Sequence, residues 1–188
     1  MILKNKFTIA LIICGLAFLA IALVNFANAS NDTPTTGYAK HVDMHLDLSE
    51  SFDTVSELKE NAPIIAKVNV TEAKSFDYGN VTFKLSDAKI KKVYKGDLKN
   101  NTSISILETG GSGADGLTYL PEGNSVFASG DEAVVFLERY VGPVAEDSYV
   151  IKGVYQGKFK IKGNKVVPPA EVHGELETIQ SIEDLSLE

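Results

Sequence analysis

Four residues near the start of the chain have side chains that could hold a metal ion. They occupy alternate positions in the stretch HVDMHLDL and are His41, Asp43, His45 and Asp47. Strict alternation with apolar residues predicts a half-buried β-strand over residues 41–48, which places all four on one face. Imidazole and carboxylate groups are zinc ligands, so the pattern indicates a candidate metal site. Side chains two positions apart on a strand are about 6.5–7 Å apart, and the alternative is an edge strand whose polar side chains prevent unwanted pairing.

A second candidate lies in the glycine-rich segment 109–131. Long connections without regular structure are uncommon and often functional, so this segment is expected to be a loop that contacts a ligand or partner. The residues assigned to that role are Gly110, Gly111, Ser112, Gly113, Asp115 and Tyr119. The stretch TGGSG lacks the Gly-Lys-Ser/Thr ending of a P-loop, which argues against a nucleotide site. The alternative is a flexible connector.

The residues available for catalysis are few. His173 is the only histidine outside residues 41–48, and no nucleophile elbow accompanies it. We therefore expect a binding module without a catalytic activity or cofactor. Two alternatives remain: a metal-dependent enzyme that uses His41 and His45 with His173, and an inhibitor of secreted proteases that presents segment 109–131.

The elements that must position these residues are mostly strands. A short helix is expected over residues 51–61, with Ser49 or Ser51 as its cap, and an amphipathic closing helix over 174–185. Strands are expected over residues 64–71, 81–94, 102–108, 133–140, 148–151, 155–162 and 165–167. A hairpin turn at 77–80 joins the first two of these strands.

The strand over 81–94 favours a barrel. Its apolar positions change phase between Leu85 and Ala88 and again between Ile90 and Val93, and each change predicts a β-bulge that lets the strand coil. The expected fold is mainly β with two flanking helices, a small OB-type Greek-key barrel. A β-sandwich is the alternative.

The beginning of the chain has the features of an export signal. Lys4 and Lys6 precede an apolar run over residues 7–24, and Ala27 and Ala29 form a small-x-small cleavage pattern. Residues 1–29 are therefore expected to be a signal peptide cleaved after Ala29, with an uncleaved anchor as the alternative. Residues 30–40 are expected to be a flexible linker, and 41–188 a single domain with a C-terminal helix.

Charge and cysteine content restrict the location and the partners. Cys14 is the only cysteine, so the cleaved chain would have none, which is typical of an exported bacterial domain and suggests a Gram-positive source. The net charge is −7, and Lys4 and Lys6 are the only charged residues before position 30, so cleavage would make it −9. An acidic domain argues against nucleic acid. We expect a secreted or cell-surface monomer that binds a protein or a cell-envelope ligand and touches a membrane only through an uncleaved N-terminal segment.

Two stretches resemble a known module. NAPIIAKV at 61–68 after a helix, followed by a long strand ending in KIKKVYKG at 89–96, resembles the netrin-like module, the OB-type barrel of tissue inhibitors of metalloproteinases. The resemblance covers about residues 55–140. With VYQGKFKI at 154–161, the chain also resembles a family of uncharacterised exported proteins of Gram-positive bacteria. The inhibitors act through an N-terminal Cys-x-Cys that ligates the protease zinc, and the cleaved chain would lack it, so the resemblance implies a fold and not that mechanism.

Overall fold

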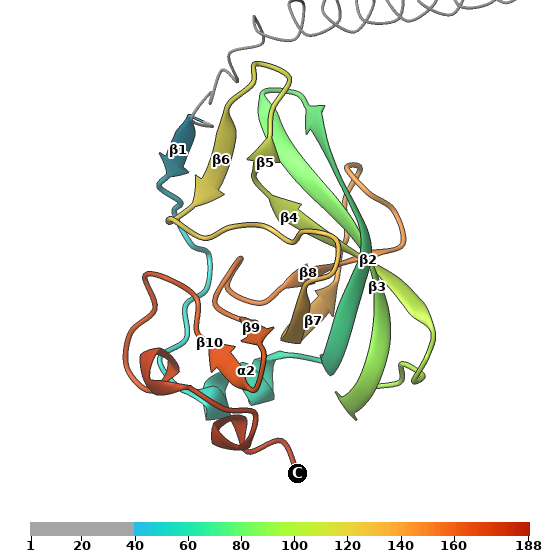
Figure 1. Cartoon of the computed structure of the whole chain (residues 1–188), viewed down its shortest axis with the longest axis vertical. Helices are drawn as coiled ribbons and strands as arrows, with labels where there is room; N and C mark the ends of the chain where they lie inside the picture. Colours follow the sequence, from blue (N-terminus) through green and yellow to red (C-terminus); the bar gives the residue numbers. More distant parts are fainter. Residues whose placement is uncertain (1–39) are drawn as a thin grey trace, which may run out of the picture. The chain divides into compact units, whose positions relative to one another are not determined.

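The structure is a computed structural model that describes residues 40–188 (Figure 1). The expected signal peptide at 1–29 lies outside the described part, as does the expected linker at 30–40 except for residue 40. The strands are β1 His41–Met44, β2 Ile64–Tyr78, β3 Val81–Lys95, β4 Ser103–Thr109, β5 Gly111–Ser112, β6 Thr118–Pro121, β7 Glu132–Arg139, β8 Ser148–Ile151, β9 Lys158–Lys162 and β10 Lys165–Val167. The helical elements are α2 Val55–Asn61 and two 3₁₀ turns, η2 Leu176–Thr178 and η3 Glu183–Leu185. The expectation of a mainly β protein is confirmed.

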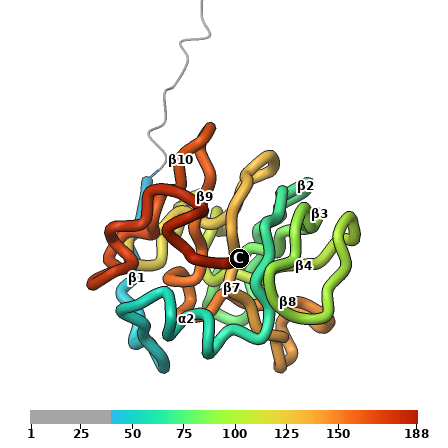
Figure 2. Tube along the Cα trace, turned by 90° about the horizontal axis from the view of Figure 1, so that it is seen from below, coloured from blue at the N-terminus to red at the C-terminus, as the bar shows by residue number. Residues whose placement is uncertain are grey.

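Seven strands form the principal sheet, in the order β10-β9-β7-β2-β3-β4-β8. β7 also pairs with β8, so five of the strands form a partly closed ring. The neighbours β7, β2, β3 and β4 are antiparallel in the spatial order of a Greek key, because the chain returns from β4 to β7 by a long connection. β4 and β8 are parallel. In Figure 2, β9 and β10 lie on the other side of β7 from β4 and β8.

The β2–β3 hairpin contains the bulges that coil the sheet. The predicted turn at its tip is present, but β2 continues to Tyr78 instead of ending near residue 71. The pairing register skips Tyr94 and Lys91 on β3 and Thr71 on β2. The bulge expected on β3 between Leu85 and Ala88 is therefore wrong, since the extra residue is Thr71 on the neighbouring strand. Leu85 and Ala88 are three residues apart, so along a regular strand their side chains point to opposite faces of the sheet without a bulge between them.

Strand β7 separates two apolar clusters. Val134 and Phe136 pack with α2 and the C-terminal segment, whereas Ala133, Val135 and Leu137 pack with residues of β2, β3 and β4. All five side chains are fully buried. A strand covered on both faces reads as a continuous apolar run, and the sequence AVVFL at 133–137 has that pattern.

Two helix predictions need correction. α2 begins at Val55, and its cap is Thr54 in a capping box with Glu57, not Ser49 or Ser51. The closing helix over 174–185 is wrong, because the segment forms only η2 and η3. The Asp184 carboxylate accepts hydrogen bonds from the N–H groups of Gln180 and Ser181, and such local side-chain bonds compete with helix formation.

The apolar positions of the C-terminal segment nevertheless face the core. Leu176, Ile179 and Leu185 are buried against the cluster that contains α2. The N–H of Val166 on β10 donates to the carbonyl of Gln180, so this segment also covers an edge of the principal sheet.

Among residues 40–188, no helix has the length and apolar character needed to span a membrane.

Candidate functional site

The two segments singled out in the sequence lie side by side. β1 pairs in parallel with β6, with His41 opposite Thr118 and Asp43 opposite Leu120. β6 in turn pairs with β5, so residues 41–44, 111–112 and 118–121 form a small three-stranded sheet (Figure 1). Segment 109–131 is therefore not a structureless loop, since it contributes two of the three strands.

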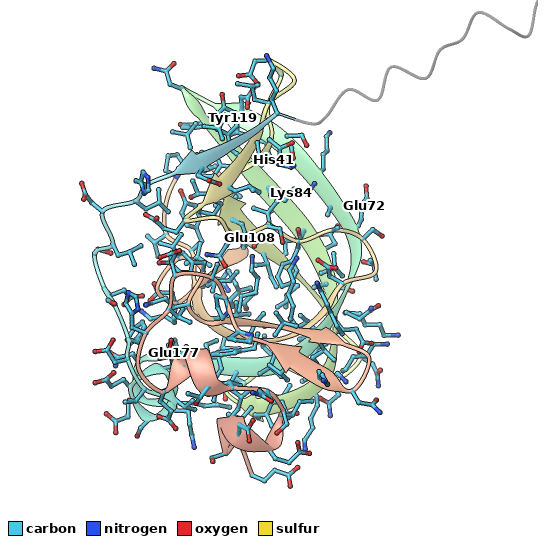
Figure 3. The ribbon with its side chains drawn as sticks, turned by 60° about the vertical axis from the view of Figure 1, so that its left-hand side comes forward. His41, Glu72, Lys84, Glu108, Tyr119 and Glu177 are labelled. Carbon is cyan, nitrogen blue, oxygen red and sulfur yellow. The ribbon has the colours of Figure 1, made fainter. Side chains whose placement is uncertain are left out.

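A cleft of about 500 Å³ lies between this small sheet and the tip of the β2–β3 hairpin. We call it the hairpin-tip cleft. Its apolar wall includes Met44, Leu46 and Val81, and its polar groups include Asp77, Asp115 and Tyr119. Figure 3 shows Tyr119 and His41 at the end of the molecule that carries the small sheet. A concave, mostly apolar site with a few polar groups is the usual form of a ligand pocket, and this volume is within the usual range.

Hydrogen bonds within the protein fix both acidic side chains of the cleft. Asp77 accepts from the Thr82 hydroxyl at 2.7 Å and from the N–H of Ala114 at 3.3 Å. Asp115 accepts from the N–H of Leu117 at 2.9 Å and from the Tyr119 hydroxyl at 2.6 Å. The bond from Ala114 to Asp77 joins segment 109–131 to the hairpin, whereas the bonds of Asp115 lie within the segment and fix its own fold.

The Tyr119–Asp115 hydrogen bond also sets the ionisation of both groups. The Tyr119 hydroxyl, followed by the Leu117 N–H, lowers the pKa of Asp115. The same bond is the main cause of a raised pKa of Tyr119. At neutral pH the pair is therefore a carboxylate held by a neutral phenol, and the cleft presents negative charge to a ligand.

The six residues predicted to bind a ligand divide into two groups. Gly113, Asp115 and Tyr119 line the hairpin-tip cleft. Gly110, Gly111 and Ser112 do not line it and instead attach β5 to the principal sheet. Gly110 and Gly111 have φ values of 106° and 113° and are buried, and the N–H of Ser112 donates to the Ser75 hydroxyl at 3.1 Å. Their role in this structure is close backbone approach.

The predicted strand over residues 41–48 is regular only at 41–44, and its polar side chains do not gather around one point. His41, Asp43, His45 and Asp47 are all exposed. His45 Nδ1 lies 3.2 Å from a carboxylate oxygen of Glu122, whose other oxygen accepts from the N–H of Leu46 at 2.6 Å. Within residues 40–188 no three histidine, cysteine or acidic side chains form a group that could hold a metal ion. The geometry of residues 40–188 therefore adds no support to the zinc hypothesis.

The contacts with Glu122 also determine its charge. Its pKa is lowered, first by the hydrogen bond from the Leu46 N–H and then by His45. Glu122 therefore anchors the end of β1 as a carboxylate.

Sequence reasoning did not identify the hairpin side of the cleft. Asp77 was assigned only to a turn, and Met44 and Leu46 only to the apolar face of a strand. The available signal was an aspartate at the first position of the predicted turn 77–80, because the side chains of such residues commonly accept hydrogen bonds from backbone.

No protein-family model matches the chain, and a comparison with curated proteins finds no significant match. The class of this protein is therefore described by its fold and its cleft. It is a mainly β protein with a partly closed ring of strands, and a small sheet forms a cleft with the tip of the β2–β3 hairpin.

Proposed function

We propose that this protein is an exported binding module, without catalytic activity, that holds an extended ligand segment in the hairpin-tip cleft. The observation that carries the proposal is the cleft itself, which both sequence-derived candidate segments help to build. Export is supported by the charged, apolar and small-residue pattern of residues 1–29.

The chemistry of the cleft favours a peptide that combines an apolar side chain with a basic one. Met44, Leu46 and Val81 offer apolar contact, and burying such area drives association. Asp77 and Asp115 supply negative charge at the same site, in a chain whose net charge is −7. A lysine or arginine of the ligand would be attracted to this end of the molecule, and an anionic ligand would be repelled.

We propose further that the ring is an OB-type barrel, as the resemblance to the netrin-like module implies. Support comes from the Greek-key order of β7, β2, β3 and β4, and from the second pairing of β7 that closes the ring through β8. The cleft lies at the connection between the first two ring strands, one of the loops through which OB-type barrels bind ligands.

A display library of random peptides tests the proposal. Peptides are selected on the wild-type chain and their binding is then measured on two variants. Ala114→Trp places a large ring in the cleft, because Ala114 is exposed and lines it. Ala128→Trp adds the same ring in the same segment at an exposed residue that does not line the cleft.

The expected result is enrichment of peptides with basic and apolar residues, whose binding Ala114→Trp weakens at least about tenfold and Ala128→Trp leaves unchanged. Selection of no peptide, or equal binding to both variants, would exclude the cleft as a peptide site.

A further inference from the structure

The outer edge of β1 has no strand paired with it among residues 40–188. β1 is the terminal strand of the order β1-β6-β5, and Figures 1 and 3 show it on the outer side of β6. The carbonyls of Lys40 and Met44 accept from Thr118 and Glu122 of the β6 side. Alternate residues of a parallel strand bond to the same neighbour, so the backbone groups of His41 and Asp43 face away from β6. A strand edge of this kind can accept another strand.

The side chains along this edge alternate between exposed polar and half-buried apolar residues, and the polar residues alternate between histidine and aspartate. The four polar residues are exposed and the intervening apolar residues are half-buried, a pattern that continues beyond β1 as far as Leu48. The exposed residues are His41, Asp43, His45 and Asp47. This order is self-complementary, because reversing it places a histidine opposite every aspartate.

Only some registers of an antiparallel pair use that complementarity. In a pair of copies related by a two-fold axis at Met44, His41 lies opposite Asp47 of the second copy and Asp43 opposite its His45. His41 and Asp43 face outward within β1, and beyond its end the N–H of Leu46 still bonds to Glu122 on the β6 side. Continuing this alternation through His45 and Asp47 supplies the hydrogen-bonded pairs of an antiparallel ladder. Moving the axis by one residue, to Asp43 or His45, places histidine opposite histidine and aspartate opposite aspartate. Like charges directly opposite each other are destabilising, and opposite charges are stabilising.

We propose that residues 41–47 pair with the same residues of a second copy of this chain, antiparallel about a two-fold axis at Met44, so that β1 of each copy lies against the residues that follow β1 in the other. The two small sheets then form one sheet of six strands. The occupant is a second copy because the charge pattern complements its own reverse, whereas an unrelated strand would have to supply that pattern independently. This dimer replaces the monomer expected from the sequence, and it does not depend on the proposed role of the hairpin-tip cleft.

The contact is small, so the dimer is expected to be weak. A few residues of one strand bury much less than the roughly 1,200 Å² of a stable interface, which places the dissociation constant at about 10 µM to 1 mM. Glu122 lies against His45 within each copy, and the exposed Lys40 precedes His41 at the start of the strand. The pair between His41 and Asp47 is therefore the better one to test.

Two single variants and their mixture test the pairing. His41→Asp gives two Asp–Asp pairs in a homodimer, and Asp47→Lys gives two His–Lys pairs. A mixture of the two variants contains an Asp–Lys pair and a native His–Asp pair in the heterodimer. His173→Asp is the matched control, because it makes the same charge change at an exposed histidine in another part of the chain.

The measurement is sedimentation velocity of the chain as an exporting host releases it, from about 5 to 500 µM at about pH 6. EDTA is included so that a metal-bridged dimer does not form. The expected result is a wild-type dimer that each edge variant weakens by about tenfold or more, that the mixture restores, and that His173→Asp leaves unchanged. A chain that stays monomeric over this range, or a dimer that the edge variants do not weaken, would overturn the proposal.

Discussion

The ammonium group of Lys158 lies 2.5 Å from the carboxylate of Glu108, and both side chains are almost fully buried, at 4% and 3% exposure. The same ammonium donates to the carbonyl of Ser125, and Glu108 accepts from the N–H of Phe127 at 2.8 Å. This pair therefore connects β9 and β4 to the end of segment 109–131, the stretch that leads into β7.

Removing one partner of this pair should destabilise the protein strongly. Glu108→Gln leaves the Lys158 charge buried without a counter-charge, and we expect a loss of about 3–5 kcal/mol in the free energy of unfolding. The double variant Glu108→Leu/Lys158→Met should recover part of that loss, although the N–H of Phe127 then lacks its acceptor. Urea denaturation provides the measurement. Asp147→Asn, which breaks the exposed ion pair with Arg139, is the control and should cost less than about 1 kcal/mol. An equal loss of unfolding free energy in Glu108→Gln and Asp147→Asn would contradict the role assigned to burial.

Ser86 should be dispensable for stability. Its side chain is fully buried, and its hydroxyl has no hydrogen-bond partner among the described residues. Ser86→Ala removes a desolvated polar group, so the free energy of unfolding should stay within about 1 kcal/mol of the wild type or rise.

Ser148 offers the comparison for Ser86, since it is equally buried but its hydroxyl donates to the carbonyl of Ala145 at 2.7 Å. Ser148→Ala should lose about 1–2 kcal/mol in the same urea titration. A larger loss in Ser86→Ala than in Ser148→Ala would show that the Ser86 hydroxyl has a partner after all.

Asp131 should contribute stability that acid removes. Burial acts to raise the pKa of its carboxyl, but hydrogen bonds from Lys160 and from the N–H of Ala128, with the nearby positive charges, outweigh it and lower the pKa. A group whose pKa is lower in the folded state stabilises the protein above its unfolded pKa, about 3.9 for aspartate, and this stabilisation is lost as the pH falls through the folded value.

The Asp131 contribution can be measured by comparing Asp131→Asn with the wild type in urea between about pH 6 and pH 2. The wild type should be more stable at the upper end, and the two curves should converge toward the lower end. In a Lys160→Met background, the loss of stability that Asp131→Asn causes at neutral pH should be smaller. A difference that grows as the pH falls would contradict the direction of the shift.

Local sequence patterns predicted the strands of the principal sheet, but not β5, β6 or the full length of β2. The apolar run of β7 and the turn after Asp77 depend on neighbours in the chain, and both are present. The parallel pairing of β1 with β6 joins residues about 77 apart, and no periodicity in either segment specifies that partner. The cleft depends on this pairing, so the wall that Met44 and Leu46 form was not predictable from either segment alone.

Burial of charge was the other feature that the pattern concealed. Lysines alternate with Phe159 and Ile161 on β9, which ordinarily indicates a solvated face. Lys158 is nevertheless buried, because Glu108 comes from a strand 50 residues earlier and supplies a counter-charge. Alternation identifies the two faces of a strand, but it does not reveal what covers each face.

Gly111 and Gly116 should respond differently to alanine, because only one of them lies against another part of the protein. Both have positive φ, 113° and 78°, so a side chain is strained at either position, by about 1–2 kcal/mol. A Cβ at Gly111 would also lie 2.7 Å from the Ser75 hydroxyl, which accepts from the N–H of Ser112, whereas no atom lies within 4 Å of a Cβ at Gly116. Gly111→Ala should therefore lose about 2–4 kcal/mol in the free energy of unfolding and Gly116→Ala about 1–2 kcal/mol.

Amide hydrogen exchange should accelerate at β5 only in Gly111→Ala, because that variant displaces the bond that attaches β5 to the hairpin. In a Ser75→Ala background the cost of Gly111→Ala should fall toward that of Gly116→Ala, and an unchanged cost would mean that backbone strain alone is responsible.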